Sequence, residues 1–389
     1  MIRRHPPVSA LLLPEVFVTC AFLAWMLNEL ELISWRRSQA LHWTERARRL
    51  FPARISRSIN LWMIPAGAAL LHRNFHPDSP WGLVFFCGFL GALLGNYPMD
   101  RDTHYDLAFR PWAHEVVSGL LLQFPRLGVF LAAFFLMPAR WDWRVPLITA
   151  VFLGLLLALQ FGLAVRLMRA LRLLRPASPR LQGLVDETAA ALGVKVRASW
   201  ELARCDANAL AFIPTGELAF TDGLLVYCPD DELKAICAHE LGHLTESRAT
   251  LAVRLLGSLA FAPMIFFNPV YHQWGLTGAA CLPLLMLAFL LIRPRLSRRM
   301  EQRADEIARE SVAGSPIYAK ALERLYRVNS SPAAMKKGGR GSHPDLYDRM
   351  LAVGLTPDYP RPAPPRGQGW TSVITTVLAT IAAMQLTGL

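Results

Sequence analysis

The sequence predicts a mainly α-helical polytopic membrane protein, with about seven to eight transmembrane helices and a cytoplasmic α+β domain that carries a small β-sheet. Three observations lead to this fold class. Hydrophobic residues make up 53% of the 389 positions, charged residues only 18%, and the mean hydropathy is +0.29. Apolar runs recur along the chain, with arginines gathered between them. Two polar stretches, 167–250 and 294–369, are left over for a soluble domain.

Several apolar runs come close to the roughly 20 residues that a helix needs to cross a bilayer. They lie at 9–33, 58–71, 81–97, 116–137, 145–166, 251–268, 275–292 and 370–389. The first run is long and has no small-residue cleavage site, so we expect a retained span rather than a signal peptide. The second and third runs are short, and we expect them to form a tilted or re-entrant pair. Such a pair leaves the sidedness of the later segments unchanged.

Arginine placement sets the expected orientation in the membrane. Segments 36–57, 166–180 and 293–303 are rich in arginine, and with these spans all three fall on the same side. Basic loops stay on the cytoplasmic side of a bilayer, so we expect both polar stretches to face the cytoplasm. The heavy use of Arg, Ala, Leu and Pro is typical of a GC-rich bacterium, which predicts an inner-membrane protein.

The net charge of +12 does not predict a nucleic-acid partner. The arginines lie mainly at the ends of apolar runs, where they set topology and meet anionic lipid headgroups. We therefore expect the lipid bilayer as a partner and no nucleic acid. The six cysteines contain no CxxC pair, which favours reduced thiols over a disulfide framework.

The most specific motif is HELGH, residues 239–243. The surrounding stretch 230–246 predicts a helix, because acidic residues crowd its first turn and an apolar stripe follows. The stripe consists of Leu233, Ile236, Leu241 and Leu244. Histidines four apart lie one turn above each other, so His239 and His243 present two imidazoles to one point. This spacing suits a tetrahedral Zn²⁺ ion with one position open for water, and Glu240 lies where it could accept a proton from that water.

A catalytic zinc site needs a third protein ligand. The run RRMEQRADEIARE, residues 298–310, places Glu301 and Asp305 four apart on one helical face. Glu301 would bind the metal, and Asp305 would hold a histidine ring from behind. On spacing alone, Glu306 and Glu310 are alternatives to Glu301. A solvated helix with ion pairs also explains the pattern.

These motifs resemble those of the M48 family of membrane metallopeptidases over roughly residues 180 to 350. The matching segments are TDGLL (221–225), DEL (231–233), HELGH (239–243), EQRAD (301–305) and HPDLYDR (343–349). The resemblance implies a zincin-like catalytic domain with one Zn²⁺ per chain. It also implies that His239, His243 and Glu301 bind the ion and that Glu240 is the catalytic base.

The resemblance implies further roles outside the metal ligands. The segment DANALAF, residues 206–212, is similar to the edge strand that binds an extended substrate in this family, which assigns substrate binding to Asn208 and Ala209. The HPDLYDR segment is similar to an element near the scissile carbonyl. This similarity assigns stabilisation of the oxyanion to His343 and Arg349.

These segments divide the chain into six parts. They are an N-terminal transmembrane region (1–169), the first part of the catalytic domain (170–250), a transmembrane hairpin (251–293), the second part of the catalytic domain (294–356), a proline-rich linker (357–369) and a C-terminal transmembrane helix (370–389).

We expect a zinc-dependent membrane endopeptidase that hydrolyses peptide bonds with a metal-activated water, in the quality control or processing of membrane proteins. Its expected partner is a polypeptide substrate, either a membrane protein or an unfolded chain. Two alternatives stay open. One is a CAAX-type prenyl protease, whose arrangement of spans around the motif is similar. The other is a non-catalytic membrane sensor or scaffold with a metallopeptidase fold.

Overall fold

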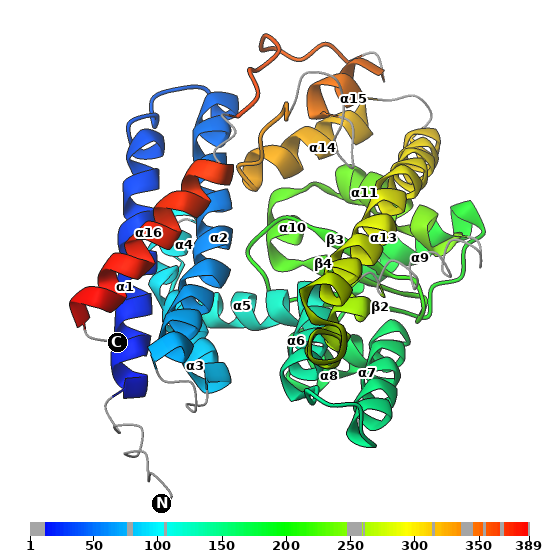
Figure 1. Ribbon diagram of the computed structural model, residues 1–389. Coiled ribbons are helices and arrows are strands. Elements are labelled where there is room, and N and C mark those ends of the chain that lie inside the picture. The colour runs from blue at the N-terminus through cyan, green and yellow to red at the C-terminus, as the bar shows by residue number, and fades with distance from the viewer. Residues whose placement is uncertain are drawn as a thin grey trace, which may run out of the picture. The chain divides into compact units, whose positions relative to one another are not determined.

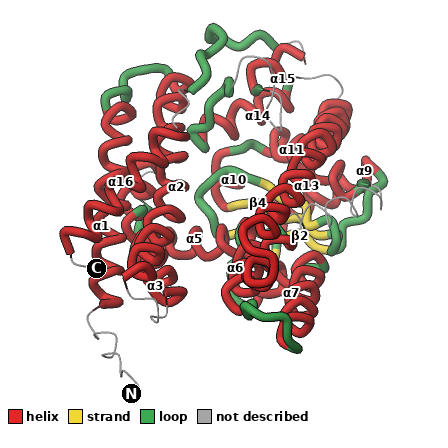
Figure 2. Tube along the Cα trace, in the orientation of Figure 1, coloured by secondary structure: helices red, strands yellow, loops and turns green. Residues whose placement is uncertain are grey.

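The structure is a computed structural model in which residues 12–75, 81–104, 107–246, 259, 261–312, 316–335, 345–352, 355–365 and 369–387 are described. These residues form mainly helices, together with one four-stranded sheet (Figures 1 and 2). The chain divides into two compact units. Unit 1 comprises Met1–Trp112, Ser330–Lys337 and Tyr359–Leu389, and unit 2 comprises Ala113–Asn329 and Gly338–Asp358.

Unit 1 is a bundle of largely apolar helices. Its helices are α1 (Leu12–Arg36), α2 (Trp43–Phe75), α3 (Trp81–Gly95), α4 (Tyr97–Thr103) and α16 (Gly369–Thr387). Helix α1 packs against α2 and α3, and α16 packs against α2. A side chain on Gly91 would lie 2.2 Å from the carbonyl oxygen of Phe17, so this glycine allows α3 to approach the backbone of α1.

Buried amides link the helices of unit 1. Asn28 Nδ2 donates to Asn96 Oδ1 at 2.7 Å, and Asn60 Nδ2 donates to Asn28 Oδ1 at 3.0 Å. The Thr376 hydroxyl of α16 in turn donates to Asn60 Oδ1 at 2.7 Å. These four side chains come from four different parts of the unit, so their hydrogen bonds fix how its helices pack.

Two helices among the described residues are long and apolar enough to cross a membrane, Leu12–Arg36 and Trp81–Thr103. Two bent helix pairs bring the number to four if each pair is one span. These pairs are Phe109–Leu122 with Pro125–Leu136 and Arg144–Gln160 with Leu163–Ala170. The described residues therefore supply two to four candidate spans, and the expected seven to eight spans stay a prediction. Half of the run 251–268, residues 251–258 and 260, lies outside the described residues.

Unit 2 combines helices with the sheet. Its elements are most of α5 (Phe109–Gln123), α6 (Pro125–Leu136), α7 (Arg144–Gln160), α8 (Leu163–Ala170), β1 (Leu174–Pro176), α9 (Pro179–Leu192), β2 (Ala198–Leu202), β3 (Ala209–Phe212), β4 (Glu217–Thr221), α10 (Asp222–Tyr227), α11 (Asp230–Leu244), η1 (Ala262–Phe266), α13 (Phe267–Ser311), α14 (Ile317–Val328) and α15 (Leu346–Ala352). The α+β character expected of the soluble part is thus present.

The sheet has the strand order β1-β2-β4-β3, so β3 lies at one edge. Strands β2 and β4 are parallel, whereas β1 and β3 pair antiparallel with their neighbours. Helix α11 packs against β3, α9, α14 and α13. A core of buried residues joins the sheet to α9, α11 and α14, and its largest members include Leu181, Phe220, Leu224, Leu233 and Leu241.

Helix α13 is 45 residues long and carries the second predicted site segment. It is interrupted at Gly275, where φ is 63° and ψ is −161°, a conformation that glycine adopts without strain. After Gly275 the helix runs on to Ser311. The apolar run 275–292 and the segment around Glu301 are therefore parts of one continuous helix.

Candidate active site

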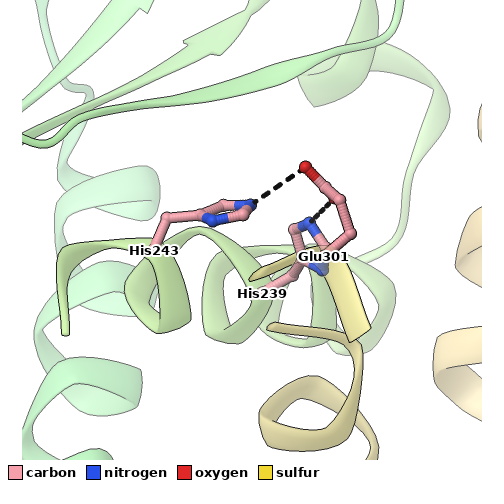
Figure 3. A group of neighbouring side chains, drawn as sticks. All are labelled: His239, His243 and Glu301. Atoms are coloured by element: carbon pink, nitrogen blue, oxygen red, sulfur yellow. Dashed lines mark ion pairs between the residues drawn. The ribbon is translucent and has the colours of Figure 1, made fainter. Parts of the chain in front are cut away.

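Helix α11 positions the HELGH motif as its sequence predicts. The helix spans Asp230–Leu244 and has three acidic residues in its first turn. Leu233, Ile236 and Leu241 from the predicted stripe are buried in the core of unit 2. Burial of this stripe fixes the rotation of the helix about its axis. His239 and His243, one turn apart, consequently point toward α13 (Figure 3).

Gly242 explains how α13 comes close enough to complete the site. A Cβ at this position would lie 3.1 Å from Ala304 Cα and 3.3 Å from Ile307 Cδ1. The two helices therefore touch at the glycine between the histidines. Glu301 lies one turn before Ala304 on α13, so this contact brings its carboxylate to the imidazoles.

Three side chains from these two helices converge on one point (Figure 3). Glu301 Oε2 lies 3.7 Å from His239 Nε2, and Glu301 Oε1 lies 3.9 Å from His243 Nε2. One ligand atom from each of the three residues lies within 4.8 Å of the other two. By contrast, Glu306 and Glu310, the alternatives that the spacing allowed, are exposed on α13.

The other ring nitrogen of His239 is held by residues of α13 and α14. Its Nδ1 lies 3.1 Å from Asp305 Oδ1 and 2.9 Å from the hydroxyl oxygen of Tyr318. The Tyr318 hydroxyl donates to Asp305 at 2.6 Å. Arg349, on α15, donates to both Asp305 and Tyr318. These contacts orient the imidazole so that Nε2 faces Glu301.

Asp305 is a carboxylate in this arrangement. Burial alone would raise its pKa, but the hydrogen bond with His239 and the positive charge of Arg349 outweigh burial and lower the pKa to about 2. An ionised Asp305 accepts hydrogen bonds. It can therefore accept one from the N–H at Nδ1 of His239, which leaves Nε2 unprotonated, with its lone pair available to a metal.

His243 has a partner of its own. Its Nδ1 lies 2.9 Å from Glu246 Oε1, a residue two positions beyond the end of α11. Tyr318 and Glu246 are the contacts that the sequence did not reveal. Glu246 follows His243 by three residues, a helical spacing that could have signalled it. Tyr318 had no such signal, because it lies on a separate helix.

Glu240 is buried on the same helix, 9% exposed. Burial raises the pKa of its carboxyl group, while the neighbouring His239 and His243 and a backbone hydrogen bond from Ala211 act in the opposite direction. The contact with Ala211 places the carboxylate against β3, the edge strand. The proposed base thus lies between the metal ligands and the expected substrate strand.

The main-chain hydrogen bonds between β3 and β4 use every second residue of β3, so the N–H and C=O groups of the residues between them lie at the free edge of the sheet. Thr221 N–H donates to Asn208 O, and Gly216 N–H donates to Phe212 O. In an antiparallel pair the groups that face the neighbouring strand alternate, so the main chain of Ala209 and Ala211 faces away from β4. Asn208 Oδ1 accepts a hydrogen bond from Ala209 N–H at 3.0 Å. The predicted substrate segment is therefore an edge strand beside Glu240.

The donor set fits a zinc ion. Two imidazole nitrogens and one carboxylate oxygen are the ligands of many catalytic zinc sites. The surrounding charge also favours a cation, because four acidic groups lie at the site beside one arginine. They are Glu240, Glu246, Glu301 and Asp305, with Arg349 as the arginine. A divalent cation would offset this excess of negative charge.

One predicted site residue, His343, lies outside the described residues. His343 falls in the segment 336–344, which is not among the described residues. The other predicted site residues are all described, and all belong to unit 2.

Comparisons with known proteins point to one family. Residues 177–354 match the sequence profile of "Peptidase family M48". A protease HtpX from Pseudomonas entomophila (strain L48) is 30% identical over 207 residues, which cover 43% of this chain and 68% of that protein. The chain belongs to peptidase family M48. The matched region contains the whole candidate site.

Two further M48 relatives extend the comparison. A protease HtpX homolog from Sulfurihydrogenibium sp. (strain YO3AOP1) is 25% identical over 270 residues, 64% of this chain and 89% of that protein. A homolog from Acidiphilium cryptum (strain JF-5) is 33% identical over 167 residues, 38% of this chain and 56% of that protein. With its candidate membrane helices and its His-His-Glu group, the chain is an M48 membrane metallopeptidase.

Proposed function

We propose that this M48 peptidase is a zinc-dependent endopeptidase of the bacterial inner membrane. It would cleave membrane proteins or unfolded chains at the cytoplasmic face, in quality control or processing. The observation that carries the proposal is the convergence of His239, His243 and Glu301 within 4.8 Å, next to the buried carboxylate of Glu240. The HtpX proteases among its relatives support the same class of activity.

His239, His243 and Glu301 would hold the metal. When bound, Zn²⁺ supplies a Lewis acid that polarises the scissile carbonyl and lowers the pKa of a water. Glu240 takes the proton of the attacking water and delivers it to the leaving amine. Asp305, Tyr318 and Arg349 keep the ring of His239 in the tautomer that a ligand needs.

Strand β3 would bind the substrate as an added strand. An extended peptide at this edge could donate its main-chain N–H groups to the outward carbonyl oxygens of Ala209 and Ala211, without regard to side-chain sequence. Asn208, which is exposed next to Ala209, would contact the same peptide. Since Glu240 contacts Ala211, a peptide bound here presents its scissile carbonyl to the base.

The oxyanion donor of the proposal comes from the HPDLYDR segment. His343 is the proposed donor to the developing negative charge. Arg349 was expected to do the same, yet its guanidinium lies on Asp305 and Tyr318. We propose that Arg349 supports His239 through these two residues.

A cleavage assay tests the proposal. The purified full-length protein, loaded with zinc, is incubated with casein as an unfolded polypeptide, in parallel with Glu240→Gln. Loss of the base should reduce cleavage by at least about 100-fold while the zinc content stays the same. Glu187→Gln is a matched control, because Glu187 is an exposed glutamate paired with Lys234. Equal cleavage by wild type and Glu240→Gln would refute Glu240 as the catalytic base, and a wild-type protein that holds zinc but cleaves nothing would favour a non-catalytic scaffold.

A further inference from the structure

We infer that Glu246 is a positioning residue of the metal site, which fixes His243 as a zinc ligand independently of the groups that fix His239. The inference rests on the metal site of the proposed function. It adds a residue outside HELGH whose contribution is separate from that of Asp305.

The geometry of His243 places its two ring nitrogens in different environments. Nδ1 lies 2.9 Å from Glu246 Oε1, while Nε2 lies 3.9 Å from Glu301 Oε1. The side chains of His243 and Glu246 are only 11% and 5% exposed. A carboxylate accepts hydrogen bonds, so it holds the imidazole proton on Nδ1 and leaves the Nε2 lone pair directed at the metal position.

The chain reaches this contact by folding back at the end of α11. The helix ends at Leu244, the Thr245 hydroxyl donates to Gly242 O at 2.8 Å, and Glu246 N–H donates to His243 O at 3.3 Å. These bonds keep the last turn closed for two residues beyond the helix. The Glu246 side chain is thereby held beside the ring three positions earlier.

The two imidazoles are supported in different ways. His239 is held across helices, by Asp305 of α13 and Tyr318 of α14, with Arg349 of α15 behind them. His243 is held from the same chain segment, by Glu246. Loss of Glu246 should therefore loosen one ligand and leave the other in place.

The expected effect is on metal affinity. Partners that hydrogen-bond to a metal-ligating histidine orient its ring and raise its basicity, and their removal typically costs about 10- to 100-fold in affinity. We expect a loss of this size for Glu246→Ala. Glu246→Gln keeps an oxygen that can accept from Nδ1, so its affinity should stay within about fivefold of wild type.

The experiment measures zinc affinity of the full-length protein by competition with a chelator of known affinity, and the visible spectrum of the Co²⁺-loaded protein. The variants are Glu246→Ala, Glu246→Gln and Glu246→Met, which has a similar size but no acceptor oxygen. Glu232→Ala is the matched control. Glu232, in the first turn of α11, also has a buried carboxylate, but its partner is Arg324, at 2.6 Å.

The expected result is weaker zinc binding and an altered Co²⁺ spectrum for Glu246→Ala and Glu246→Met, with rescue by Glu246→Gln. Glu232→Ala should lower the thermal midpoint without changing zinc affinity. Wild-type affinity in both Glu246→Ala and Glu246→Met would overturn the inference, as would a loss of zinc affinity in Glu232→Ala as large as the loss in Glu246→Ala. A wild-type protein that binds no zinc would instead overturn the proposed function itself.

Discussion

Residue-scale contacts determine what each side chain of the site can do. Arg349 shows this most clearly, because its role depends on where its charge is placed. Its guanidinium is buried against Asp305 and the Tyr318 hydroxyl, and Asp305 in turn contacts His239 Nδ1. Arg349 is thus linked to a metal ligand through one carboxylate. An oxyanion donor would instead contact the substrate.

Arg349→Gln separates these two roles. Removal of the cation leaves Asp305 without its buried charge partner, which should lower the free energy of unfolding by roughly 2–3 kcal/mol. His239 should be held less firmly, so zinc affinity should fall while kcat of the fully loaded protein changes little. The measurements are chelator competition and kcat at saturating zinc. Unchanged affinity with a 100-fold loss of kcat would show that Arg349 acts on the oxyanion.

Some of these residues could be predicted from the sequence and others could not. HELGH fixes the spacing of its own ligands, because a helix sets that geometry locally. The choice among Glu301, Glu306 and Glu310 depends on which face of α13 meets α11. The spacing of residues within α13 does not carry that information. Tyr318 reaches the site from a third helix, and no local pattern marks it.

At the scale of elements, the contact between α11 and α13 at Gly242 assembles the metal site. Gly242→Val adds a branched side chain where even a Cβ lies 3.1 Å from Ala304 Cα. Such overpacking should cost about 1–3 kcal/mol of stability. It should also move Glu301 away from the histidines and lower zinc affinity.

A matched glycine controls for the change in helix propensity. Gly183 lies inside α9 with nothing within 4 Å of its added Cβ. Gly183→Ala should therefore raise the free energy of unfolding by about 0.5–1 kcal/mol and leave zinc binding unchanged. If Gly242→Val binds zinc as tightly as wild type, the contact between α11 and α13 does not set the position of Glu301.

Strand β3 supplies the second element-scale prediction. The Ala211 N–H faces away from β4 and toward Glu240, so Ala211→Pro should preserve the sheet while removing the bond to Glu240 and placing a ring at the edge where a strand would add. We expect folded, zinc-loaded protein whose kcat/KM for peptides falls at least tenfold. Leu210→Pro is the contrasting variant, because the Leu210 N–H faces β4 and its loss should destabilise the sheet. Wild-type kcat/KM in Ala211→Pro would argue against strand addition.

Element boundaries were harder to predict than the elements themselves. The sequence suggested that a short span begins at 58, after an arginine-rich segment, but α2 runs unbroken from Trp43 to Phe75. In its basic first half, Glu45 pairs with Arg48 and Arg49 along the helix, which adds a small local stabilisation. Hydropathy marks where a helix becomes apolar, and backbone hydrogen bonds continue past that point.

For the whole molecule, arginine placement predicts that the polar stretches 167–250 and 294–369 face the cytoplasm. Cys205 tests this prediction, because it is an exposed thiol of unit 2. After Cys281→Ser, a membrane-impermeant maleimide should label Cys205 in inside-out vesicles and not in intact cells. Partial burial and nearby carboxylates raise the pKa of the Cys205 thiol, so labelling should quicken as pH rises. Labelling in intact cells would place the stretch 167–250 on the opposite side.

The account depends above all on one zinc ion held jointly by α11 and α13. The most direct measurement is the zinc content per chain after dialysis against a moderate chelator, for wild type, Glu301→Gln and Glu310→Gln. Glu310 is the matched control, since it is an exposed glutamate of the same helix. We predict about one zinc per chain in wild type and Glu310→Gln and almost none in Glu301→Gln. Equal zinc in all three proteins would contradict the site.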